Sequence, residues 1–130
     1  MSEPPVVLDA TALLALLQQE PGADRVAGCL PQAVISAVNL AEVVAKLADH
    51  GIAPARAQTT LGGLDLDVRD FDAAMGYAAG ALRQATHALG LALGERACLA
   101  LAASLRGVAM TADRAWARLA PDIARVEVIR

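Results

Sequence analysis

Residues 6–14 read VVLDATALL, so a short apolar run ends in an acid and leads at once into leucines at helical spacing. The run Val6–Leu8 predicts a buried strand that is closed by Asp9. Leucines between residues 13 and 17 then predict a helix, which the Glu-Pro-Gly sequence at 20–22 ends. A buried strand followed directly by a helix is typical of a parallel α/β sheet.

The same alternation continues along the rest of the chain. Further strands are expected at 33–36, 64–68, 108–110 and 126–129, and further helices at 23–30, 40–50, 54–62, 71–88, 94–105 and around Trp116. This order predicts a three-layer α/β fold with a central, mostly parallel sheet of four to five strands and helices on both faces. No linker or repeat divides the sequence, so we expect one domain over residues 1–130.

Composition narrows the class of protein. The chain has 31 alanines but only one each of Phe, Trp and Tyr, which favours close-packed helices over an all-β domain. No run approaches the roughly 18 apolar residues of a membrane span, and residues 1–5 lack the basic start of a signal peptide. We therefore expect a cytosolic protein without a membrane partner, and two buried, reduced thiols at Cys29 and Cys98.

The net charge of −3 is unusual for a protein that binds nucleic acid. The negative charge is concentrated in residues 1–65, whereas residues 66–130 carry eight Lys or Arg against seven Asp or Glu. If four acids belong to a metal site, setting them aside turns the net charge of −3 into +1. A weakly basic surface around an acidic pocket is compatible with an RNA ligand.

Four acids are expected to meet at one edge of the sheet. Asp9 ends the first strand, and Asp113 follows the strand at 108–110. In parallel sheets, sites form beyond the carboxyl ends of the strands. Glu42 and Glu95 are each predicted in the first turn of a helix that begins near the same edge. A purely structural role stays open for these acids, since Asn39 and Glu42 also form a possible capping box and acids are common in first turns.

Gathering four carboxylates costs electrostatic free energy unless a cation neutralises them or some of their pKa values rise. Hard oxygen ligands suit Mg²⁺ or Mn²⁺. Such ions activate water and stabilise the charge that develops on a phosphate. The residues therefore favour hydrolysis of phosphodiester bonds.

Four ordered blocks carry a family resemblance. They are Val7–Leu14, Asn39–Val43, Leu93–Ala102 and Thr111–Trp116, and they resemble the PIN-domain family, with the VapC-type toxins of bacterial toxin–antitoxin pairs as the nearest likeness. The resemblance implies a magnesium-dependent endoribonuclease, usually dimeric and silenced by a small antitoxin.

The resemblance also assigns residues. It places the first, second and fourth family acids at Asp9, Glu42 and Asp113, and it implies that the hydroxyls of Thr11 and Thr111 support the acids or the metal. We expect catalytic roles for all four acids, with metal ligation by Asp9, Glu95 and Asp113, and with Glu42 orienting or deprotonating the attacking water. Cleavage by this route would leave 5′-phosphate and 3′-hydroxyl ends.

Glu95 departs from the family pattern, which ordinarily has Asp in the third block. The added methylene moves the carboxylate relative to the backbone, and Mg²⁺ demands near-octahedral geometry. We expect activity to survive because the charge is kept. The alternative is a catalytically weakened PIN domain that acts as an RNA- or protein-binding module. A phospho-aspartate phosphatase is disfavoured because Thr11 stands where that class has a second acid.

Other residues have weaker interpretations. Arg96 and Arg114 either contact RNA phosphates or are ordinary solvated helix residues. His50 and His87 lie near predicted helix ends, where the helix dipole favours a cation, so catalysis by either is disfavoured. Trp116 is expected to be a core anchor rather than a platform for base stacking.

Overall fold

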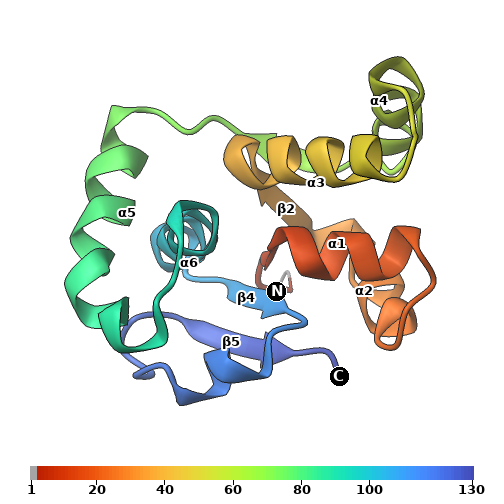
Figure 1. Cartoon of the computed structure of the whole chain (residues 1–130). Helices are drawn as coiled ribbons and strands as arrows, with labels where there is room; N and C mark the ends of the chain where they lie inside the picture. Colours follow the sequence, from red (N-terminus) through yellow and green to blue (C-terminus); the bar gives the residue numbers. More distant parts are fainter. Residues whose placement is uncertain (1–2) are drawn as a thin grey trace.

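The computed structural model describes residues 3–130 and contains one five-stranded sheet in the order β3-β2-β1-β4-β5 (Figure 1). All four strand pairings are parallel. The strands are β1 Val6–Leu8, β2 Ala33–Ser36, β3 Asp67–Arg69, β4 Val108–Thr111 and β5 Arg125–Val128. The predicted α/β architecture, with a parallel sheet between helices, is confirmed.

Helices cover both faces of the sheet. They are α1 Ala10–Leu17, α2 Ala23–Gly28, α3 Ala37–Asp49, α4 Pro54–Gly62, α5 Ala73–Thr86 and α6 Leu93–Leu105, with short 3-10 turns η1 Leu30–Gln32, η2 His87–Leu89 and η3 Arg114–Arg118. Leu8 of β1 packs with α1 to α4 on one face, whereas its neighbour Val7 packs with α6 on the other. This split follows from strand geometry, because successive side chains point to opposite faces.

The inner helix of the second face is α6, which lies between α5 and the sheet (Figure 1). Its residues Ala97–Ala102 are all buried, and three of them are alanines. Small side chains let α6 approach both of its neighbours closely. The alanine-rich composition therefore reflects close helix packing, as predicted.

Polar side chains begin three of the helices. Asp9, Ser36 and Asp72 each accept a hydrogen bond from a backbone N–H in the first turn of α1, α3 and α5, which satisfies a donor that the helix itself cannot. The N-cap of α6 is Ala92, which has no polar side chain for this purpose.

Two local predictions were wrong. The third strand is Asp67–Arg69 rather than 64–68, because Leu64 and Leu66 pack against the core below α3 and α4 while the strand itself is exposed. Ser36, not Asn39, caps α3, so the capping-box interpretation of Asn39 and Glu42 fails.

Other predictions agree with the structure to within a few residues. Cys29 and Cys98 are buried free thiols, and Trp116 is a buried core residue.

Within residues 3–130, no single helix is long and apolar enough to span a membrane, although the bent pair Ala73–Leu89 and Leu93–Leu105 together meets that criterion by length and composition.

Candidate active site

A small pocket of about 70 Å³ opens at the carboxyl edge of the sheet. We call it the acid pocket, and its lining residues are Asp9, Ala10, Thr11, Asn39, Glu42, Glu95, Asp113 and Trp116. The structure thus brings all four sequence-predicted acids, and the predicted Thr11, to one place. They come from four separate segments: the end of β1, the helices α3 and α6, and the turn after β4.

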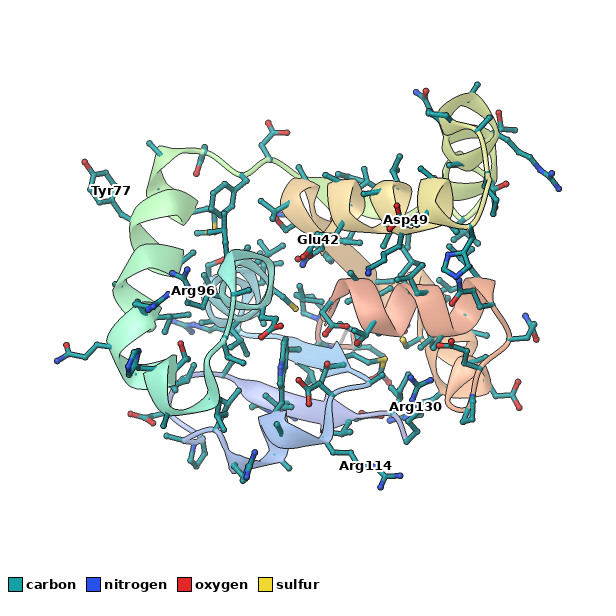
Figure 2. The ribbon with its side chains drawn as sticks, viewed as in Figure 1. Glu42, Asp49, Tyr77, Arg96, Arg114 and Arg130 are labelled. Atoms are coloured by element: carbon teal, nitrogen blue, oxygen red, sulfur yellow. The ribbon has the colours of Figure 1, made fainter. Side chains whose placement is uncertain are left out.

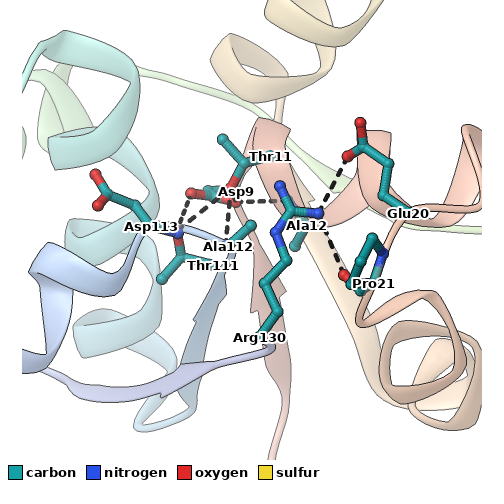
Figure 3. A network of polar contacts seen from close by, with 9 residues as sticks. All are labelled: Asp9, Thr11, Ala12, Glu20, Pro21, Thr111, Ala112, Asp113 and Arg130. Carbon is teal, nitrogen blue, oxygen red and sulfur yellow. Dashed lines mark hydrogen bonds and ion pairs between the residues drawn. The ribbon is translucent and has the colours of Figure 1, made fainter.

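Asp9 is the most buried of the four acids that line the acid pocket and is only 3% exposed. Its Oδ1 accepts hydrogen bonds from the Thr11 hydroxyl and the Ala12 backbone N–H, each at 2.8 Å. Its Oδ2 accepts from the Thr111 hydroxyl at 2.5 Å (Figure 3). An ionised carboxylate has about four acceptor positions, so these donors leave Oδ2 with one position for a further ligand.

The two threonines also hold the turn after β4. The backbone N–H of Ala112 donates to Thr11 Oγ1 at 2.9 Å, and that of Asp113 donates to Thr111 Oγ1 at 3.0 Å (Figure 3). Each hydroxyl therefore donates to Asp9 and accepts from the segment that carries Asp113. This fixes the first and fourth acids relative to each other across 104 residues of sequence.

Asp113 is exposed and caps the short helix η3, since its Oδ1 accepts from the Ala115 backbone N–H at 2.9 Å. The expected position near the start of a helix is thus observed. Capping uses one of its two carboxylate oxygens.

Glu42 lies in the second turn of α3, so its predicted place in the first turn was wrong. Its carboxylate reaches toward α6 (Figure 2) and lies against Gly94, where even a Cβ atom would overlap it. The Asn39 side-chain amide donates to Glu42 Oε1 at 2.8 Å and to the Gly94 carbonyl at 2.9 Å. Asn39 therefore joins the second acid to the start of α6.

Glu95 lies in the first turn of α6, as predicted, and is partly buried. Burial raises the pKa of its carboxyl group above the ordinary value. The backbone N–H of Ala92 opposes this, whereas the charges of Asp113, Asp9 and Glu42 raise the pKa further. All three other acids therefore act on Glu95 electrostatically.

The pKa of Asp9 is also raised. Burial is the largest cause, hydrogen bonds from Thr111, Ala12 and Thr11 oppose it, and the charge of Glu42 adds to it. Two acids in one pocket with pKa values raised by burial and by neighbouring carboxylates would be stabilised by a positive ion.

The donor set is all oxygen and thus suits a hard divalent cation. Asp9 retains an acceptor position, and Glu42 and Glu95 have long side chains that can adjust. Among residues 3–130, however, no three Asp, Glu, His or Cys side chains already lie close enough together to enclose an ion. The residues fit such a cation by their chemistry and their shared location. To enclose the ion, the acid side chains would have to move closer together.

The two arginines proposed to bind RNA have other partners. Arg96 donates to the carbonyls of Ala79 at 3.0 Å and Leu91 at 3.3 Å, so it joins α6 to α5 and to the turn before α6. Arg114 is exposed and donates to the Arg130 carbonyl at 3.1 Å. Contact with RNA stays a prediction for both.

The sequence pattern predicts no site role for Asn39, Gly94 or Trp116. Asn39 and Trp116 line the acid pocket, and Gly94 leaves room for Glu42. The only available signal was the Asn39–Glu42 spacing of three residues, which places both side chains on one helix face and had been interpreted as a cap.

Comparisons with solved structures show the same fold. A DNA-bound VapBC structure from Salmonella typhimurium matches with a TM-score of 0.73 and 20% identity, covering 98% of this chain and 99% of that chain. A toxin–antitoxin complex from Klebsiella pneumoniae matches with a TM-score of 0.75 and 20% identity, covering 96% and 98%. VapBC-5 from Mycobacterium tuberculosis gives a TM-score of 0.60 at 22% identity, covering 98% and 99%.

Among curated proteins, none matches the sequence at a significant level. The family model for the PIN domain matches residues 6–121, which is nearly the whole sequence and includes all four acids. The chain therefore belongs to the PIN-domain family.

Proposed function

We propose that this chain is a metal-dependent endoribonuclease and the toxin of a toxin–antitoxin pair. The observation that carries the proposal is the convergence of Asp9, Glu42, Glu95 and Asp113 on one pocket at the carboxyl edge of a parallel sheet. Family membership supports it, because a four-acid pocket in a PIN domain is the expected place for phosphodiester hydrolysis.

In this proposal Asp9, Glu95 and Asp113 hold the cation, which is Mg²⁺ or Mn²⁺. A bound cation would neutralise the carboxylates and stabilise the charge that develops on the scissile phosphate. Asp9 is the most rigid ligand, because three hydrogen bonds fix it. Thr11 and Thr111 support it and hold Asp113 in place.

Glu42 has a different role because it reaches the pocket from α3. Its carboxylate is exposed and receives its hydrogen bond from a neutral amide, so it is free to accept a proton from the attacking water or to orient that water. Arg114 follows Asp113 directly, is exposed and donates to a single backbone carbonyl, whereas Arg96 is partly buried and donates to two, so Arg114 is the better placed of the two arginines to contact a phosphate.

The partners in this proposal follow from the related structures. Several are complexes described as toxin–antitoxin or VapBC assemblies, which supports a small antitoxin protein as the partner of this chain. A homodimer, a single domain over residues 1–130 and a cytosolic location complete the proposal as expectations from the sequence.

Glu95 favours a second candidate, a weakened PIN domain that binds RNA or protein without cutting. Glutamate occupies the position where the family ordinarily has Asp, and no ready-made three-ligand cage exists among residues 3–130. RNA binding without metal-dependent cleavage would support this candidate.

The test is cleavage of end-labelled single-stranded RNA with Mg²⁺, with Mn²⁺ and with chelator. The parent should cut only with metal and leave 5′-phosphate ends, and Asp9→Asn should be inactive. Asp49→Asn is the matched control, since this exposed acid lies at the far end of α3 (Figure 2). Cleavage that resists chelator, or that Asp9→Asn retains, would contradict the proposal.

A further inference from the structure

Asn39 is a buried amide on the helix that carries Glu42. It is 1% exposed, although it has no role in capping α3. Both of its donor positions are used: Nδ2 donates to Glu42 Oε1 at 2.8 Å and to the Gly94 carbonyl at 2.9 Å. One side chain thus contacts both the second acid and the residue before Glu95.

Glu42 has a single hydrogen bond within residues 3–130 that can orient its carboxylate. Its side chain is exposed, and the bond from Asn39 is the only hydrogen bond it makes within residues 3–130. A free glutamate on a helix surface samples many rotamers and loses that freedom only when something holds it. Gly94 provides the space and Asn39 provides the restraint.

The orientation of the Asn39 amide is fixed by its two acceptors. Turning the amide over would place Oδ1 against two oxygens that cannot donate to it. In the observed orientation, the buried Oδ1 has no hydrogen-bond partner among residues 3–130. A buried acceptor without a partner costs free energy. The two hydrogen bonds that Asn39 donates to Glu42 and Gly94 offset this cost.

We propose that Asn39 is a positioning residue that holds the Glu42 carboxylate against the start of α6 and so keeps it in the acid pocket. The inference rests on the proposed function and deepens it, because it identifies how an exposed acid is kept ready for the reaction. Asn39 acts only through Glu42 and touches no reacting atom.

A double-mutant cycle tests this dependence. Asn39→Ala should lower kcat for RNA cleavage by about 10- to 100-fold, as is typical when a hydrogen-bond partner of a site carboxylate is removed, with little change in KM. In a Glu42→Ala background the same substitution should have no further effect beyond about twofold. An equal loss in both backgrounds would overturn the inference.

Thr86→Val is the matched control for loss of a buried hydrogen bond. Thr86 is fully buried, and its hydroxyl donates to the Leu82 carbonyl at 2.8 Å on α5, outside the acid pocket. This variant should lose stability and keep its kcat. If Thr86→Val lowers kcat as much as Asn39→Ala, the effect is general destabilisation and the inference fails.

A measurement without activity separates this inference from the proposed function. In the ¹⁵N spectrum of the parent, the side-chain NH₂ of Asn39 should exchange slowly with solvent, and Glu42→Ala should shift it, whereas Asp49→Asn should not. An Asn39 resonance that ignores Glu42→Ala would overturn the inference. A parent that shows the expected resonances but cuts no RNA would instead contradict the proposed function alone.

Discussion

Gly94→Ala should separate activity from stability. Gly94 lies in the first turn of α6, and a Cβ added there would overlap the carboxyl group of Glu42, whose atoms are its three nearest contacts. The backbone can stay in place because the far end of a flexible side chain is free to move. The substitution therefore perturbs the acid pocket first through the Glu42 side chain.

The magnitude follows from the geometry. Carbon and oxygen settle at roughly 3.5 Å or more, so the Glu42 carboxylate must retreat by about 1 Å. Misplacement of a catalytic group on this scale costs on the order of 100-fold in rate. Ala gains about 0.5–1 kcal/mol over Gly in a helix, and the weakened bond from Asn39 offsets a similar amount, so the free energy of unfolding should change little.

Gly80→Ala on α5 is the control, because a Cβ at this position meets no atom within 4 Å. It should gain about 0.5–1 kcal/mol, which corresponds to a few degrees in Tm, and keep full activity. The assays are thermal unfolding and single-turnover RNA cleavage at saturating Mn²⁺. A Gly94→Ala variant that cuts RNA at the parental rate would refute the claim that Glu42 is used from this position.

Three further substitutions test other parts of the site, and a labelling experiment tests the burial of Cys98. Burial raises the pKa of Asp9 above its ordinary value of 3.8, so the folded chain retains a proton there after the unfolded chain has lost it. Metal-free stability should therefore fall as pH rises through that window, and Asp9→Asn should flatten the dependence in urea melts; parallel curves would contradict this. Glu95→Asp should stay within about tenfold of the parent in metal-dependent cleavage because the charge is kept; an inactive parent beside an active variant would show that the natural glutamate disables the site. Thr111→Val removes the donor to Asp9 Oδ2 and the acceptor for the Asp113 N–H, and should cost about 1.5–3 kcal/mol in chemical denaturation; an unchanged midpoint would argue against the network. Cys98 is fully buried with a pKa raised well above 9.0, so it should resist thiol reagents until the protein unfolds.

The sequence predicted the fold because its strands are short apolar runs that end in recognisable residues. The runs at Val6–Leu8 and Ala33–Ser36 match the observed strands, and β4 extends its predicted run by one residue. The third strand was misplaced because Leu64 and Leu66 suggested alternation, whereas these side chains face the core from the turn before an exposed edge strand. A hydrophobic pattern in the sequence indicates which residues are buried, not which form a strand. Here Leu64 and Leu66 pack against the core, whereas β3 begins only after them.

The four acids could be predicted because each follows a strand or lies near the start of a helix, but their hydrogen bonds could not. Asn39 and Ser36 are both good helix caps in sequence terms, and only the path of the backbone shows that Ser36 is used. Because Ser36 caps the helix, Asn39 is free to contact Glu42 and Gly94. Gly94 lies 55 residues further along the sequence. Contacts of that range depend on helix packing, which local patterns do not specify.

The buried alanines of α6 have a consequence for how mutations should act on this protein. Ala97, Ala100 and Ala102 are buried where the helix meets its neighbours, and enlarging a well-packed residue forces backbone shifts. Such a shift would carry Glu95 and Gly94 with it as one rigid piece, moving two parts of the site at once. In a screen for loss of the proposed nuclease activity, substitutions at these alanines should therefore appear beside substitutions at the acids, and a larger side chain at any of them should inactivate as strongly as the loss of a charge.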